Sequence, residues 1–422
     1  MGWIHNYMRA ALLCLAALVG LVALFVALQA LVLFTTSDRV IMARLGEAVR
    51  TGVLAPTLDV HSPYGDTGLD YDMFTECLAL STNLGNEDWP LMNRVLLTPH
   101  PEYRDQTKIS PCEVLVSELA AGTLAAQSSY MRYWHGHQIY LRPMLSIMSL
   151  AKVHIANAML IIASLGALTL AVRRRFGTCG AMGLVFLLIA GSNILTVPAV
   201  TVHALTWAFA FASAALIAEW VRTHEAEAPK TIALVFSCGC IAAFFDLLFS
   251  PPFAPTLIAF FAIASALERQ TARRAIGAGA APTIAWFAGF GLAWAGKWVL
   301  AASVMGWTEM LADIIGVIQF RSLGEAAVSA PPLAVTAAAF RHGTLIGCAL
   351  VAALFITGFA KPRREQMRTA LLLTPLIIPI LWIELLRNHS LEHPAFAARS
   401  FVLFAVIPLL AALSLRRAAK VN

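Results

Sequence analysis

The segment Ala11–Phe34 reads ALLCLAALVGLVALFVALQALVLF, an apolar run interrupted only by Gln29. As a helix, a run of this length crosses the roughly 30 Å hydrocarbon core of a bilayer and exceeds the core of a signal peptide. No clean small-residue cleavage site follows it, and further apolar runs lie downstream, so we interpret it as an uncleaved signal anchor. The segment predicts a membrane protein with a cytosolic N-terminus.

The composition of the whole chain supports this interpretation. Of its 422 residues, 59% are hydrophobic and only 13% are charged, which lies outside the usual range of soluble globular proteins. The net charge of +6 does not indicate a nucleic-acid-binding protein, because the basic residues form short tracts beside apolar runs. The pattern predicts an all-α polytopic membrane protein with about ten transmembrane helices. These cover residues 11–34, 153–172, 180–200, 203–221, 231–249, 255–268, 281–302, 343–360, 369–387 and 400–415.

The basic residues also orient the predicted helices. With the N-terminus inside, alternate short loops carry Arg173–Arg175, then Arg222 and Lys230, and so on to Arg416 and Arg417, as the positive-inside rule requires. Both termini are therefore expected in the cytosol. Three parts follow: the N-terminus and first transmembrane helix (1–34), an extracytoplasmic loop domain (35–152), and a multi-span domain (153–422) with outer loops 303–341 and 387–399.

Two pairs of cysteines call for different interpretations. Cys77 and Cys112 share the first large loop, and on the oxidising side of a membrane we expect them to form a disulfide. Cys238 and Cys240 lie in an apolar helix without a nearby histidine or carboxylate, so we expect them to be packing residues.

Asp38 stands where the first apolar run ends, and an amphipathic stretch, 40–54, follows it. This places a carboxylate at the depth of the lipid headgroups. Two interpretations fit: a catalytic carboxylate facing the outer surface, or one member of an ordinary charge pair that flanks a membrane helix.

An acidic, glycine-containing segment, 64–72, includes Asp70 and Asp72. Its carboxylates suit a hard cation or the hydroxyl groups of a sugar, and a solvated acidic turn explains them equally well. The spacing of an EF-hand loop is absent, so the sequence leaves open whether a divalent cation is a cofactor.

The densest aromatic and basic tract runs from 130 to 142. Aromatic rings stack on sugars and arginine forks bind phosphate oxygens, so the tract suits a saccharide or phosphate pocket. An interfacial aromatic belt accounts for the tyrosines and the tryptophan but not for the histidines and arginines. The candidate binding residues here are Arg132, Tyr133, Trp134, His135, His137 and Arg142.

Asp246 and Lys297 are ionisable residues embedded near the outer ends of apolar runs. Such residues indicate functional sites by default, although a structural ion pair between these two also fits. The last outer segment adds candidates of the same kind: Glu384, Asn388, His389, His393 and Arg399. A zinc site built from the histidines lacks any supporting spacing, so no metal ligand is assigned.

The overall plan resembles the GT-C class of membrane glycosyltransferases: a first span, a large external loop with a carboxylate at its start, and many further spans. The resemblance implies transfer of a sugar from a polyprenyl-phosphate donor to an envelope glycan or glycolipid acceptor on the outer face. It implies that Asp38 is the base. It implies that Lys297, Arg399 or Arg142 offsets the charge that builds up on the phosphate leaving group. It implies that Tyr133, Trp134 and His135 hold the sugar.

Tracts such as Arg132–Gly136 are also similar to those of uncharacterised bacterial multi-span proteins, which implies the bacterial cytoplasmic (inner) membrane and its lipids as the setting. A transporter or flippase of lipid-linked glycans is the alternative, because it would also use buried Asp246, Lys297 and Glu384. Such a protein does not need so large an external loop, and the chain shows no convincing pair of broken helices.

Overall fold

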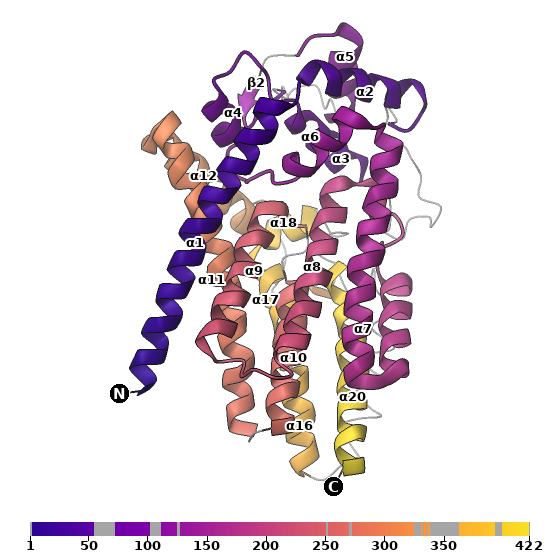
Figure 1. Cartoon of the computed structure of the whole chain (residues 1–422), viewed down its shortest axis with the longest axis vertical. Coiled ribbons are helices and arrows are strands. Elements are labelled where there is room, and N and C mark those ends of the chain that lie inside the picture. The colour runs from indigo at the N-terminus through magenta and orange to yellow at the C-terminus, as the bar shows by residue number, and fades with distance from the viewer. Residues whose placement is uncertain are drawn as a thin grey trace.

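Over the residues that this computed structural model describes, the protein is all-α apart from one two-stranded sheet. The structure describes residues 2–54, 72–101, 111–124, 127–249, 252–269, 272–324, 331, 333–334, 336–337, 363–392 and 399–421. The N- and C-terminal ends lie at the same end of a long helical bundle, and a smaller external domain covers the opposite end (Figure 1).

The external domain is built from short helices around a core of its own. It comprises α2 (Asp38–Arg50), α3 (Met73–Asn83), α4 (Leu91–Leu97), α5 (Pro111–Ala121) and α6 (Gln138–Ile147). Strands β1 (Pro99–Pro101) and β2 (Gln127–Ser129) pair antiparallel, with Pro99 opposite Ser129. Leu45, Leu80, Leu115 and Leu141, from four different helices, are fully enclosed together. The predicted loop 35–152 therefore contains a packed helical domain.

The bundle comprises the remaining described helices. These are α1 (Gly2–Thr35), α7 (Leu150–Gly191), η1 (Val197–Ala199), α8 (Thr201–Trp220), α9 (Pro229–Phe245), α10 (Phe253–Arg269), α11 (Ala272–Met305), α12 (Trp307–Leu323), α16 (Arg363–Leu373), η2 (Thr374–Leu376), α17 (Ile377–Leu385), α18 (Arg387–Glu392), η3 (Ser400–Val402) and α20 (Leu403–Val421). Gly177 has φ 79° and divides α7 into two helices, which overlap the predicted spans 153–172 and 180–200.

Every predicted span overlaps a described helix except 343–360, which lies outside the described residues, but the predicted span 180–200 extends beyond the end of α7 at Gly191. Five of the described helices are long and apolar enough to cross a membrane: His5–Thr35, Leu150–Gly191, Thr201–Trp220, Arg273–Met305 and Glu365–Leu385. The chain is thus a helical protein with several membrane-spanning candidates. The predicted number of about ten spans stays a prediction.

Helix α10 occupies the centre of the bundle. Every residue from Phe253 to Leu267 is buried, so none of this stretch faces lipid. Beside it, α9 and α11 approach at two glycines. A Cβ on Gly239 would lie 2.0 Å from the carbonyl oxygen of Trp286, and one on Gly289 would lie 2.1 Å from that of Phe236. Small residues permit such backbone-to-backbone packing, which is typical of membrane helices.

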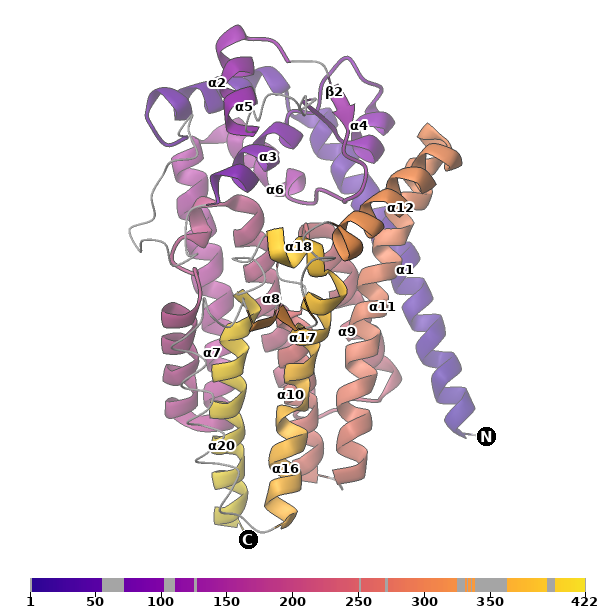
Figure 2. The ribbon, with the colours of Figure 1, turned by 180° about the vertical axis from the view of Figure 1, so that it is seen from behind.

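Helix α12 lies within the predicted outer loop 303–341. Gly306, with φ 100°, turns the chain after α11, and α12 then runs back toward α18 (Figure 2). The outward face of α12 carries exposed Leu311, Ile315 and Ile318. This part of the loop is therefore a helix with an apolar outward face.

Candidate functional site

The aromatic tract 130–137 joins the external domain to the bundle. Trp134 is fully enclosed: its indole N–H donates to the Ala293 carbonyl at 2.8 Å, and its ring contacts Phe25 and Phe244. Gly136 donates to the Phe244 carbonyl at 2.8 Å. Trp134 therefore contacts protein on all sides, and its predicted role in sugar binding stays a prediction that the burial does not favour.

Lys297 is also fully buried. Its Nζ donates to the Val95 carbonyl at 2.8 Å and lies 5.4 Å from the centre of the Trp134 ring. Asp246 is engaged elsewhere, where it accepts the N–H of Phe249 at 2.7 Å. The ion pair between Asp246 and Lys297 that the sequence left open is therefore not formed.

Asp38 begins α2 and lies in a buried pocket of protein donors. Arg142 Nη1 donates to Asp38 Oδ1 at 2.8 Å, and the N–H of Gly85 donates to the same oxygen at 3.0 Å. Arg94 Nη2 lies 3.9 Å from Oδ2. Arg142 also donates to the carbonyl of Thr36 at 2.9 Å. This geometry favours a structural ion pair that fixes the exit of the first span, and the role of Asp38 as a base stays a prediction.

A cavity of about 140 Å³ lies between the α11–α12 hairpin and the tract at Arg132 and Tyr133. Its aromatic walls are ordered, since Tyr133 stacks on Trp294 with ring centroids 5.7 Å apart. Ile318 lines the cavity although it is 53% exposed, so the cavity extends to the outward face of α12. The lining residues are Arg132, Tyr133, Leu248, Trp294, Trp298, Ile314, Val317, Ile318, Arg321, Ser322 and Leu386.

Two arginines stand at the wall of this cavity. The guanidinium of Arg321 lies 5.4 Å from the centre of the Tyr133 ring and donates to its hydroxyl. Arg132 Nη1 lies 3.7 Å from a carboxylate oxygen of Asp313. Arg321 Nη1 and Arg132 Nε are buried and have no hydrogen-bond partner within the described part of the chain. Buried donors without a partner in the chain are available to a water molecule or to a polar ligand.

A second group of charged residues gathers where the external domain meets the bundle. His203 Nε2, in α8, lies 3.3 Å from Asp72 Oδ2 and 3.3 Å from Arg399 Nη1. Arg399 also interacts electrostatically with Asp246. Two candidates far apart in the sequence, Asp72 and Arg399, thus meet at one imidazole, and a third, Asp246, interacts with Arg399. We call Asp72, His203, Asp246 and Arg399 the His203 cluster.

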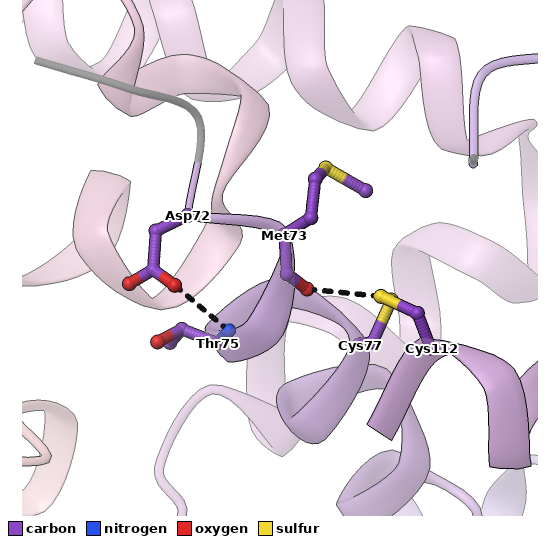
Figure 3. The surroundings of a disulfide bond; sticks show 5 residues. All are labelled: Asp72, Met73, Thr75, Cys77 and Cys112. Carbon is purple, nitrogen blue, oxygen red and sulfur yellow. Dashed lines mark hydrogen bonds between the residues drawn. A yellow bond between two sulfur atoms is a disulfide. The ribbon is translucent and has the colours of Figure 1, made fainter. Parts of the chain in front are cut away.

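The helix that carries Asp72 is held firmly. Asp72 Oδ1 accepts the N–H of Thr75 at the start of α3, and the Cys77–Cys112 disulfide joins α3 to α5 (Figure 3). The structure thus contains the predicted disulfide. Glu76, fully buried, accepts the backbone N–H of Thr201 at 2.7 Å. A carboxylate is favourable at a helix N-terminus, so Glu76 caps α8 two residues before His203.

One short segment links the cavity to the His203 cluster. Leu248 lines the cavity, and the ring of the next residue, Phe249, lies 4.3 Å from the ring of His203. Leu248 has φ 72°, a left-handed conformation that is strained for a bulky side chain. The strain is held in place partly by Asp246, whose side chain accepts the N–H of Phe249.

The histidines of the tract are enclosed near the cavity. His135 Nε2 lies 2.9 Å from the Tyr130 carbonyl, and its ring centre lies 5.7 Å from that of His137. Burial lowers the pKa of His135 well below its usual value and the pKa of His137 to about 4. Both imidazoles are therefore neutral near pH 7.

The last outer segment contributes contacts of a different kind. Glu384 accepts the Thr336 hydroxyl at 2.7 Å and lies 3.6 Å from Arg387. Asn388 is buried against Gly324 at the end of α12, and His389 is partly buried. Two further candidates, Asp70 and His393, lie outside the described residues.

Sequence reasoning did not select three residues that the structure places at these sites. His203 had a detectable signal, since it is an ionisable group at the outer end of the predicted helix 203–221. Glu76 had a weaker one, as a carboxylate shortly after the acidic segment 64–72. Arg321 had none, because its position depends on α12, which the sequence placed in a loop. Within the described ranges, no group of three or more His, Cys, Asp or Glu residues is arranged to hold a metal ion.

Comparisons with known proteins found no match: no family model, curated protein or solved structure is significantly similar to the chain.

Proposed function

We propose that the protein is a GT-C-type membrane glycosyltransferase that moves a sugar from a polyprenyl-phosphate donor to an envelope glycan or glycolipid on the outer face. The observation that carries this proposal is the cavity beside α12, because apolar walls, stacked aromatic rings and two arginines with unused donors meet there. The walls suit a prenyl chain, and the aromatic rings suit a sugar. Arg132 and Arg321 suit the phosphate.

The setting that fits this activity is the bacterial cytoplasmic membrane, with both termini in the cytosol. The arginine tract Arg173–Arg175 lies close to Gly177, where α7 reverses, and Arg416 lies near the C-terminal end. Both chain termini lie at the end of the bundle opposite the external domain (Figure 1). Basic groups at this end and the cavity at the other support an outward-facing site.

A transporter of lipid-linked glycans is the second candidate, and the His203 cluster favours it. Buried acid, imidazole and guanidinium groups are typical of ion-coupled transport paths. The two candidates differ in outcome, since a transferase leaves a new glycosidic bond whereas a transporter moves an unchanged lipid.

The proposal is tested in nanodiscs with a short-chain polyprenyl phosphate as the binding probe. Arg321→Gln removes the charge but keeps a polar side chain, and we expect affinity to fall about tenfold, the weight of one charge-assisted hydrogen bond. Arg222→Gln is the matched control, because Arg222 lies exposed near the opposite end of the bundle and pairs with Glu219. Equal affinity in both variants would remove the cavity from the proposal.

Transfer is then measured with radiolabelled polyprenyl-phosphate sugars and isolated envelope glycan. Label in the glycan supports the transferase. Label that stays on the lipid but appears in the opposite leaflet supports the transporter. Label that does neither with any donor overturns both candidates.

A further inference from the structure

We propose that Ser128 and His100 form a nucleophile and its base, and that the pair transfers the acyl group of an ester. This activity is separate from sugar transfer and does not rest on the proposed function. The two residues stand on the paired strands of the external domain, where Ser128 Oγ lies 3.1 Å from His100 Nε2. A serine hydroxyl in contact with an imidazole is the arrangement that activates serine for covalent catalysis.

The pairing of β1 with β2 sets this contact. His100 lies directly opposite Ser128 in the antiparallel register, so the two side chains emerge on the same face of the strands. Pro99 and Pro101 flank His100 and have no backbone N–H, so His100 supplies the only backbone donor of β1. A slip by one residue would place a proline opposite Ser128, which disfavours any other register.

The imidazole of His100 is in the state that a base requires. Burial lowers its pKa below the usual value of 6.5, a hydrogen bond with the Pro101 backbone raises it, and the charge of Arg132 lowers it. The net shift is downward, so the ring is neutral near pH 7. Because proline has no N–H, the Pro101 carbonyl is the acceptor in this bond. When Nδ1 donates to it, Nε2 is left to take the hydroxyl proton of Ser128.

Two other hydroxyl groups of the described chain also lie beside an imidazole, but their contacts do not suit this role. Thr82 Oγ1 lies 3.3 Å from His137 Nε2, yet its proton goes to a backbone carbonyl of α3 and both residues are buried. Thr223 Oγ1 lies 2.9 Å from His224 Nδ1, but that nitrogen also faces a carbonyl oxygen at 3.1 Å and therefore carries a proton. Ser128 is half-buried, and its hydroxyl makes no second hydrogen bond with the described residues.

The neighbouring side chains favour the charge that acyl transfer creates. The ring of Tyr130 packs edge-on against that of His100, with centres 5.1 Å apart. The guanidinium of Arg132 lies 5.0 Å from the centre of the Tyr130 ring, and its positive charge reaches His100. A fixed positive charge beside the nucleophile favours the oxyanion of a tetrahedral intermediate. Tyr130 thus holds the imidazole in place, and Arg132 supplies the charge.

The pair is also within reach of a substrate. Ser128 and His100 are both half-buried, and β2 lies at the end of the molecule away from the two chain termini (Figure 1). Neither residue lines the cavity beside α12. An ester can therefore approach Ser128 from the water around the external domain, at a place distinct from that cavity.

The reaction balances with a hydroxyl compound as the only second reactant. Ser128 Oγ forms a bond to the carbonyl carbon of the ester while its proton moves to His100 Nε2. The ester C–O bond then breaks, and the alcohol leaves with the proton from Nε2. A second hydroxyl group, of water or of a glycan, gives its proton to Nε2 as it attacks the acyl-serine. That proton passes to Ser128 Oγ as the new acid or ester departs.

The first test uses a fluorophosphonate probe, which reacts with activated serine hydroxyl groups. The full-length protein in nanodiscs is expected to take up the probe on Ser128, located by peptide mass spectrometry. Ser128→Ala is expected to lose the label. Ser129→Ala is the matched control on the same strand and is expected to keep it, because the Ser129 hydroxyl faces Met131 Sδ at 3.4 Å. An unlabelled wild type, or a label that persists in Ser128→Ala, overturns the inference.

The second test measures turnover of p-nitrophenyl acetate as the ester. A base contributes about a hundredfold or more, so His100→Gln is expected to lower kcat at least that far. His224→Gln is the control, an exposed histidine whose turnover is expected to stay within about twofold of wild type. Thermal unfolding shows whether each variant is folded. Turnover by folded His100→Gln that equals that of the wild type overturns the inference.

The two tests are independent of the proposed function. Neither uses a polyprenyl phosphate or a glycan, so failure to transfer sugar leaves the labelling of Ser128 unaffected. If His100→Gln does not fold, the probe still decides through Ser128→Ala and Ser129→Ala, which remove one hydroxyl oxygen each.

Discussion

Arg142 and Asp38 form a buried ion pair that joins the helix after the first span to the helix before the second. The two residues stand far apart in the sequence, yet Arg142 Nη1 lies 2.8 Å from Asp38 Oδ1. Arg142 also contacts Thr36, so one guanidinium fixes the point where the chain leaves the membrane. The external domain is therefore attached to α1 by a charge that is out of contact with water.

Removal of Arg142 alone is expected to be strongly destabilising. Arg142→Met leaves Asp38 buried beside only the more distant Arg94, and loss of one partner from a buried pair typically costs about 3–5 kcal/mol. Unfolding is followed by denaturant titration in detergent micelles. Arg44→Met is the control, because Arg44 and Glu47 form an exposed pair, for which we expect less than about 1 kcal/mol. Similar losses in the two variants would contradict the buried-pair interpretation.

The crossing of α9 and α11 gives a second prediction. A Cβ at Gly289 would lie 2.1 Å from the Phe236 carbonyl oxygen, so Gly289→Ala must separate two backbones. We expect a loss of roughly 2–3 kcal/mol, at the upper end for overpacking. Gly291→Ala on the same helix meets nothing within 4 Å and is expected to be neutral or slightly stabilising. A thermal-unfolding comparison in which Gly291→Ala is the less stable variant rules out the close crossing.

Much of the helical architecture could be predicted because a membrane helix is recognisable from a local run of apolar residues. Long apolar runs located α1, both halves of α7, and α11, although some of the predicted ends differ from the observed ones by as much as nine residues. Two features of the fold could not be predicted from the sequence, for physical reasons. The central position of α10 follows from packing on all its sides, which no local pattern encodes. Helix α12 combines Glu309, Asp313 and Arg321 with apolar residues, and this composition resembles a loop until its neighbours are known.

The residues of the candidate sites could also be predicted only in part from the sequence. Residue type and position selected Asp72, Arg132, Tyr133 and Arg399, which the structure places at the cavity or the His203 cluster. The same reasoning selected Trp134, which proves to be enclosed by three helices. Arginine and tryptophan have the same chemistry in a ligand site and in a structural contact. Only burial in the tertiary structure distinguishes a ligand-binding residue from a structural one, and burial cannot be predicted reliably from a single sequence.

Lys297 provides a third prediction, because its contacts favour a structural role over phosphate binding. It donates to the Val95 carbonyl and faces Trp134, and it does not line the cavity. Lys297→Met keeps much of the side-chain volume and removes a buried charge, so we expect unchanged or greater stability. Affinity for the polyprenyl phosphate is expected to stay within about twofold of wild type. A tenfold weaker affinity would place Lys297 at the phosphate instead.

The enclosed histidines predict how stability depends on pH. Burial lowers the pKa of His137 to about 4, whereas an unfolded histidine titrates near 6.5. Between these values the unfolded chain binds a proton that the folded chain does not, so stability is full above pH 6.5 and falls as the pH drops toward 4. The difference corresponds to roughly 3 kcal/mol.

His137→Asn is expected to lose this acid-dependent part of the stability. The variant lacks the group that must stay neutral in the fold, so its free energy of unfolding should change less between pH 7 and pH 5 than that of the wild type. Some slope will remain, because burial and the neighbouring His137 also lower the pKa of His135 in the wild type, and burial still acts in the variant. Denaturant titrations at the two pH values measure the difference directly. An equal pH dependence in variant and wild type would show that His137 is protonated in the folded protein or exposed to water, contrary to its enclosed position beside Thr82.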